Sequence, residues 1–216
     1  MRRLWIGATF LIGVLVLLPL RVMLAAGDQG LAARQVSGSV WAGQLGDATW
    51  RGIALGDLAV ALAPLSLLTG APRLTFAGPA LVGAASGAGV TGLSGSIDAS
   101  GQTPLPIGRI SFQNLDIAFE NGRCTAASGG VTVTTIGPVA SAMGGELNGL
   151  ARCDAGKLLL PLASATAGMQ MRIGGDGRWQ ALISLTTVDG ATRSALLASG
   201  FAPTPQGLSR RLEGHL

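Results

Sequence analysis

The stretch Arg109–Ala127, RISFQNLDIAFENGRCTAA, decides the fold class of this chain. Apolar and polar residues alternate along it, as they do in a strand with one buried face. The alternation slips by one position at Gln113-Asn114, which predicts a β-bulge. One long, bulged strand is therefore expected, with its apolar face made of Ile110, Phe112, Leu115, Ile117 and Phe119.

The dipeptide Asn121-Gly122 follows this strand and favours a type I′ turn, which joins two strands through two residues. Residues flanking such a turn face each other across the hairpin. Glu120 should therefore pair with Arg123, and Phe119 with Cys124. This register puts Cys124 on the apolar face.

The same alternation recurs through the rest of the chain. It predicts a mostly β fold: a single curved, mainly antiparallel sheet domain over residues 28–216, with one or two short helices. The expected helices are Pro64–Gly70 and Ala191–Ala198. The expected strands are a hairpin over Gln35–Trp50 that turns at Gly43, Gly46 and Asp47, then Leu55–Leu62, a hairpin within Gly78–Gly101, Gly145–Cys153, Lys157–Leu162, Met169–Ile173, Trp179–Leu185 and a final edge strand, Leu208–Leu216.

Glycine is the strongest compositional signal, with 34 residues among 216, alongside 10 prolines and no tyrosine. Glycine is unfavourable inside helices and common in turns and bulges, so its abundance favours an all-β domain. Disorder is the alternative, but a mean hydropathy of +0.49 without long polar tracts opposes it.

The run Leu4–Leu20, LWIGATFLIGVLVLLPL, carries no charge and is preceded by Arg2 and Arg3 and followed by Arg21. At about 1.5 Å per residue it covers most of a bilayer core of roughly 30 Å. We expect residues 1–27 to form a transmembrane anchor in contact with inner-membrane lipid, with Trp5 at the interface. A cleaved secretory signal is the alternative, with Ala25-Ala26-Gly27 as a poor cleavage site.

The arginines before the apolar run outweigh the one after it, which predicts a cytoplasmic N-terminus and a periplasmic bulk. Arg2, Arg3 and Arg21 also supply three of the fifteen basic residues behind the net charge of +4. Twelve basic residues then face eleven acidic ones, and no basic run is interleaved with aromatic residues. A nucleic-acid partner is not expected.

Residues that carry chemistry are scarce. His215, the single histidine, lies among charged residues on the polar face of the last predicted strand, so no catalytic triad is built around the core. Gly87, Gly89 and Gly92 match a dinucleotide-binding fingerprint, but the residues that follow suit a hairpin rather than the required helix. We expect no enzyme, no cofactor, no metal and no small-molecule substrate.

The two cysteines, Cys124 and Cys153, both fall on predicted apolar faces. In an exported chain such a pair predicts a disulfide, and two free buried thiols are the alternative. Trp41 and Trp50 end the first predicted hairpin and are expected either to pack in the core or near the membrane, or to form a partner contact.

Several segments together resemble the type II secretion system protein N family. They are the N-terminal anchor, GSVWAG at Gly38–Gly43, Trp50, LGDL at Leu55–Leu58, LAPLSLLTG at Leu62–Gly70, Cys124 and CDAG at Cys153–Gly156. The resemblance implies an accessory inner-membrane subunit of the secretion pathway that exports folded periplasmic proteins, with other subunits of that system as partners. Gly38–Gly70 also resembles the opening strands of AsmA-type proteins, and a lipid-binding or lipid-transfer groove is the alternative function.

A surface is then expected to perform the function. The edge strand Leu208–Leu216 has open backbone groups that a neighbouring subunit could join, and Arg210 and Arg211 discourage indiscriminate pairing. Deleting Leu208–Leu216 is expected to leave the protein folded and to weaken its association with other subunits.

Overall fold

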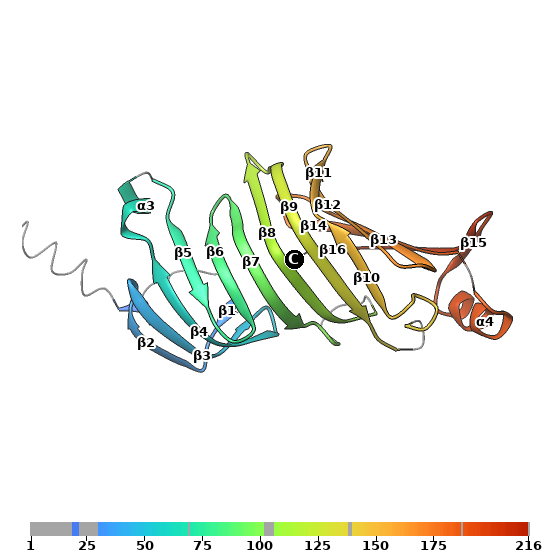
Figure 1. The fold of residues 1–216 in the computed structure, drawn as a ribbon, viewed down its shortest axis with the longest axis horizontal. Coiled ribbons are helices and arrows are strands. Elements are labelled where there is room, and N and C mark those ends of the chain that lie inside the picture. Colours follow the sequence, from blue (N-terminus) through green and yellow to red (C-terminus); the bar gives the residue numbers. More distant parts are fainter. Residues whose placement is uncertain are drawn as a thin grey trace, which may run out of the picture. The chain divides into compact units, whose positions relative to one another are not determined.

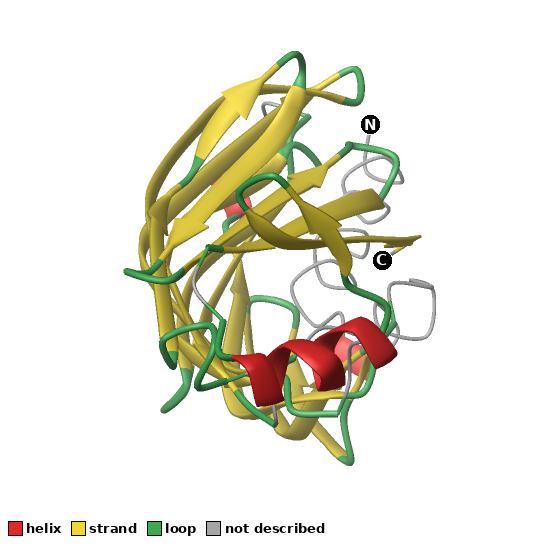
Figure 2. Cartoon of the chain, turned by 90° about the vertical axis from the view of Figure 1, so that its right-hand side faces the viewer, coloured by secondary structure: helices red, strands yellow, loops and turns green. Residues whose placement is uncertain are grey.

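The computed structural model describes residues 19–21, 30–68, 70–101, 106–137, 140–186 and 188–215. Most of the predicted anchor, residues 1–27, lies outside these ranges. Within them, no helix combines the length and the apolar character that crossing a membrane requires. The chain divides into two compact units, residues 1–87 (unit 1) and 88–216 (unit 2). Strands make up most of both, which confirms the mostly β prediction (Figure 2).

Unit 1 is an antiparallel sheet drawn in blue to teal in Figure 1. β3 pairs with β1 and β2 along one side and with β4 along the other, and β5 and β6 follow in order. The elements are β1 (Leu31–Ala32), β2 (Gln35–Ser39), β3 (Ala42–Trp50), β4 (Ile53–Leu62), α3 (Pro64–Leu68), β5 (Arg73–Ala77) and β6 (Leu81–Ser86).

The turn of the first hairpin differs from the prediction. β2 and β3 are joined at Val40-Trp41, and the predicted turn residues Gly43, Gly46 and Asp47 lie inside β3. Asp47 has a φ of 48° beside a register shift in the β3–β4 pairing, so it forms a bulge instead of a turn. The apolar pair at the true turn is explained by packing, because Val40 is only 1% exposed.

The core of unit 1 contains a residue from the apolar N-terminal run. Leu20 is buried together with Val40, Leu45, Ala48, Leu58 and Val60. Pro19 forms an isolated antiparallel bridge with Ser39 in β2, and Nε of Arg21 donates a hydrogen bond to the carbonyl oxygen of Val36 over 3.0 Å. The last residues of the apolar run therefore belong to the fold of unit 1.

Unit 2 is a longer antiparallel sheet with the strand order β7-β8-β9-β10-β12-β13-β14-β16-β15, and β11 pairs with β12 beside β10. Its elements are β7 (Gly89–Asp98), β8 (Ile107–Glu120), β9 (Arg123–Thr135), β10 (Glu146–Leu150), β11 (Arg152–Asp154), β12 (Lys157–Ala163), β13 (Ala167–Ile173), β14 (Arg178–Leu185), α4 (Gly190–Ala198), β15 (Ala202–Thr204) and β16 (Gly207–His215).

The hairpin predicted from Arg109–Ala127 is confirmed by β8 and β9. Glu120 pairs with Arg123 and Phe119 with Cys124 across a turn in which Asn121 and Gly122 have φ values of 50° and 75°. The predicted bulge is also present, as a register shift between Gln113 and Asp116. A bulge bends the strand that carries it, and the two long strands curve along their length in Figure 1.

One apolar face of unit 2 forms a continuous core. Met169, Ile183 and Leu185 from neighbouring strands are at most 1% exposed, so this face of the sheet is covered. Leu196 of α4, Phe201 after it and Met143 of the β9–β10 connection belong to the same cluster. These residues cover this face of the sheet in the described part of unit 2.

Both predicted helices are present as short elements. α3 lies within the predicted segment Pro64–Gly70. α4 begins after Asp189, whose side chain accepts a hydrogen bond from the N–H of Thr192. The glycine fingerprint lies on strands instead: Gly87 follows β6, while Gly89 and Gly92 are in β7. The helix that a dinucleotide site needs after these glycines does not follow them.

Candidate interaction surface

Cys124 and Cys153 form a disulfide that ties β9 to β11, with their Cα atoms 5.5 Å apart. The backbone supports the same approach, because the N–H of Cys124 donates to the carbonyl of Gly156 over 2.8 Å. Ala155 and Gly156 form the turn between β11 and β12 with φ values of 50° and 77°. The predicted disulfide between the two cysteines is confirmed. It has a structural role, because it holds β9 next to β11.

Trp41 and Trp50 have different surroundings. Trp41 lies in the β2–β3 turn and packs against the buried cluster of unit 1. Trp50 ends β3, is 37% exposed and has the guanidinium of Arg51 5.9 Å from its ring centroid. Of the two, Trp50 presents the larger accessible apolar surface, held by a cation–π contact.

β16 carries an open edge of unit 2 beyond the residues that β15 covers. On one side it pairs with β14 from Leu208 to His215, and on the other β15 covers only Gly207, Leu208 and Ser209. The prediction that Leu208–Leu216 is an edge strand is therefore wrong for its first two residues and right for Arg210–His215. In the described part of the chain, no strand pairs with the outer side of that segment.

Arg210 and Arg211 lie on opposite faces of β16, since side chains alternate along a strand. Arg210 shares the face of buried Leu208 and is half-buried, whereas Arg211 is exposed on the other face. Exposed Glu213 and His215 follow on the Arg211 face. The open edge is therefore flanked by charge on both faces, which limits non-specific strand pairing.

The direction of the backbone groups follows from the β15–β16 turn. Thr204 and Gly207 flank a two-residue turn and so exchange hydrogen bonds. Hydrogen-bonding direction alternates along an antiparallel strand. Arg211 and Glu213 then direct their N–H and C=O groups outward from the sheet, which is the arrangement that accepts an added strand.

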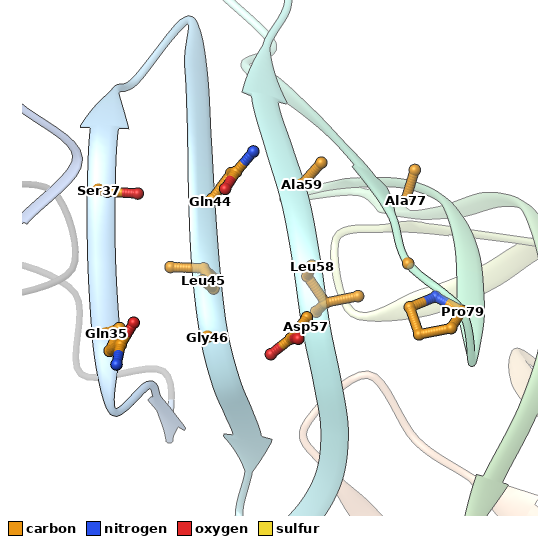
Figure 3. A pocket seen from close by; sticks show the side chains of 11 residues that line it. Gln35, Ser37, Gln44, Leu45, Gly46, Asp57, Leu58, Ala59, Ala77 and Pro79 are labelled. Carbon is orange, nitrogen blue, oxygen red and sulfur yellow. The ribbon is translucent and has the colours of Figure 1, made fainter.

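Unit 1 has a polar hollow of about 410 Å³ over β2, β3 and β4 (Figure 3). Its lining includes Gln35 and Ser37 of β2, Gln44 of β3, and Asp57 and Ala59 of β4, with Ala77 and Pro79 at its far side. Asp57 is already engaged, because its Oδ1 accepts from the N–H of Asp47 over 3.0 Å. The lining offers amide, hydroxyl and carboxylate groups, with neither histidine nor cysteine among its residues.

The described residues hold no group of three or more His, Cys, Asp or Glu side chains close enough to bind a metal ion. His215 is exposed at the end of β16, far along the strand from the buried Leu208. Among the described residues, the strand edge, the exposed Trp50 and the polar hollow of unit 1 are candidates for an interaction.

A sequence model of the family described as type II secretion system (T2SS), protein N, matches residues 29–210. The chain belongs to the type II secretion system protein N family. The match covers both units from the start of β1 into β16, whereas the apolar run Leu4–Leu20 precedes it. No curated protein and no solved structure matches the chain.

Membership of the T2SS protein N family makes this chain a type II secretion system subunit. It implies interaction with other components of that system. The family is one of structural subunits of a secretion machine, and the resemblance seen in the sequence is confirmed.

Sequence reasoning missed two features of the T2SS protein N chain. The cover that β15 gives to β16 comes from only three residues, too few for a periodic signal. The burial of Leu20 was missed because an apolar residue at the end of a membrane-like run carries the same signal whether lipid or protein covers it. Gly43, which lies under Leu20, was the available sign of a close approach.

Proposed function

We propose that this chain is an accessory subunit of the type II secretion system, anchored in the inner membrane through the part of the apolar run that precedes Pro19, with its units in the periplasm. It acts by docking other subunits and supports export of folded periplasmic proteins across the outer membrane. The family match carries the secretion role. The open edge of Arg210–His215 supports docking by strand addition.

A point change tests the edge better than deleting the strand. Leu208 is 1% exposed, and eight residues of β16 pair with β14, so removing Leu208–Leu216 would uncover the core of unit 2. The expectation that the deletion leaves the fold intact is therefore replaced by a change at Glu213, which is exposed.

Glu213→Pro removes one outward N–H without touching the β14 side, and proline is tolerated on strand edges. Glu213→Ala is the matched control, because it loses the same carboxylate and keeps the N–H. Intact protein and both variants are recovered from the same membranes, and co-purifying secretion subunits are identified by mass spectrometry. We expect weaker recovery with Glu213→Pro alone. Equal recovery with all three would show that this edge is not the docking strand.

The orientation is tested separately with reporters fused after Leu216. A reporter that works only in the periplasm should be active, because Arg2 and Arg3 hold the N-terminus in the cytoplasm. Activity of a cytoplasm-only reporter instead would reverse the proposed topology.

A further inference from the structure

The end of the apolar run is fixed against unit 1 by three neighbouring residues. Leu20 is 4% exposed and lies over Gly43, Pro19 bridges to Ser39, and Arg21 is hydrogen-bonded to Val36. Arg21 therefore has a defined position on β2. If the apolar run before it enters the bilayer, this part of β2 lies at the membrane surface.

A second hollow, of about 430 Å³, opens at this place. It is lined by Arg21, Arg34, Gln35, Val36 and Ser37. Two of these five described residues are arginines, and none of the five is acidic. The hydrogen bond from Arg21 to Val36 uses Nε and leaves its two Nη groups outside that bond.

Among the described residues, Arg34 forms an ion pair with Asp47, at 3.6 Å between Nη1 and Oδ2. This separation is longer than a charge-assisted hydrogen bond, which spans about 2.7 to 2.9 Å. Both side chains are largely exposed, at 80% and 69%, so water screens the pair. An anion that forms paired hydrogen bonds with the guanidinium can therefore compete with Asp47 for Arg34.

We infer that Arg21 and Arg34 bind the phosphate of an anionic membrane phospholipid in this hollow. Guanidinium groups recognise phosphate by paired hydrogen bonds, and arginines next to a membrane segment are attracted to anionic lipids. Gln35 and Ser37 supply further polar groups at the wall of the hollow. The inference rests on the proposed membrane anchoring, and it adds a headgroup site to the contact that the apolar run makes with the acyl chains.

The test uses the full chain in neutral detergent micelles and counts bound lipid by native mass spectrometry. Phosphatidylglycerol, zwitterionic phosphatidylcholine and inorganic phosphate are titrated in turn. We expect selective binding of phosphatidylglycerol. The double variant Arg21→Gln/Arg34→Gln should bind it about 30-fold more weakly, because each arginine near an anionic surface contributes a factor of roughly five.

The control variant is Arg152→Gln/Arg193→Gln, which loses the same charge from exposed positions of unit 2 and should bind like the intact protein. Arg34→Gln alone guards against misfolding, since Arg34 is largely exposed, and it should weaken binding partly. Unchanged affinity in the Arg21→Gln/Arg34→Gln variant would overturn the inference. So would equal binding of phosphatidylcholine, or displacement of the lipid by an equal concentration of inorganic phosphate.

The outcome is separable from that of the docking proposal. Lipid binding that survives while Glu213→Pro recovers all subunits would remove the docking edge and leave the headgroup site. If binding is not selective for phosphatidylglycerol but Glu213→Pro recovers fewer subunits, the headgroup site is wrong and the docking edge stands.

Discussion

Gly43 occupies the position in β3 over which Leu20 packs. A methyl group added there would lie 2.5 Å from Cδ2 of Leu20 and 2.9 Å from the carbonyl oxygen of Ser39. The leucine side chain can move, but the backbone oxygen is held by the β2–β3 hairpin. A residue as small as alanine is therefore too large for this site.

Gly43→Ala is expected to destabilise the protein by about 1 to 3 kcal/mol, the usual cost of forcing extra volume into a packed core. Thermal unfolding followed by circular dichroism measures it. Gly87→Ala is the control, because a methyl group there has nothing within 4 Å. If both variants unfold like the intact protein, Leu20 does not pack on Gly43.

Asp98, at the end of β7, has a carboxyl group with a shifted pKa. Hydrogen bonds from the Ser100 side chain and backbone N–H lower the pKa of its carboxyl group below the ordinary value, with a smaller contribution from Arg109. A lowered pKa in the folded state means that the stabilisation is complete above the ordinary pKa and is lost as the pH falls through the folded value.

An NMR titration should therefore find the midpoint of Asp98 below that of an unstructured aspartate. Ser100→Ala removes the largest contribution and should raise the pKa of Asp98 toward its ordinary value. If the pKa of Asp98 is the same in Ser100→Ala, groups other than the Ser100 side chain cause the shift. The destabilisation below about pH 4 should be smaller in Asp98→Asn, which cannot titrate.

At the scale of elements, the disulfide joins the β8–β9 hairpin to β11, and its two cysteines are 29 residues apart in the sequence. In the described sheet β9 and β11 do not form a strand pair; β9 pairs with β10, and β11 pairs with β12. The disulfide therefore adds a direct covalent link between β9 and β11. In the chain-entropy model, a loop of this length contributes about 3 to 4 kcal/mol.

Cys124→Ser/Cys153→Ser is expected to lower the melting temperature by the equivalent of about 3 kcal/mol, a large part of a typical domain stability of roughly 5 to 15 kcal/mol. A reducing agent should lower the melting temperature of the intact protein in the same way and leave the variant unchanged. Two free thiols in the native protein would contradict the bridge.

Strand positions and pairing could be read from the sequence where one face is buried and the turn is polar, as in β8 and β9. There the alternation and Asn121-Gly122 agree, so register, bulge and cysteine face all followed. The β2–β3 turn could not be read in this way. Val40 enters the core of unit 1, so burial determines the turn, while the glycines that resemble turn residues serve a bulge and the close approach of Leu20.

The candidate surface was predictable in part. The alternation of the sequence showed the strand and the charges of β16, but the partial cover of this strand by β15 depends on a three-residue pairing. The hollow between Arg21 and Arg34 depends on how residues on either side of positions 22–29 meet on β2. Sequence spacing alone does not bring those two arginines together.

At the scale of the whole molecule, Leu20 bears on the choice between an anchor and a cleaved signal. Cleavage near Ala25-Ala26-Gly27 would remove Leu20 from the core of unit 1 and expose the residues it covers. Burying a leucine contributes about 1.5 to 3 kcal/mol, so the cut form would be less stable.

The protein purified from membranes is therefore expected to retain its N-terminal run. Intact mass measurement together with N-terminal sequencing decides this directly. A mature chain that begins after Ala26 would mean that unit 1 folds without Leu20. It would also contradict the proposed membrane anchor.

The docked residues Pro19–Arg21 also determine how unit 1 responds to force. A slack tether absorbs a pull by extending before its load reaches the domain. Here the first resistance comes from the Leu20 side chain over Gly43 and from the hydrogen bond of Arg21 to Val36 on the outer strand of the sheet. If the preceding apolar run enters the membrane as proposed, tension in it would reach β2 and β3 through these two contacts.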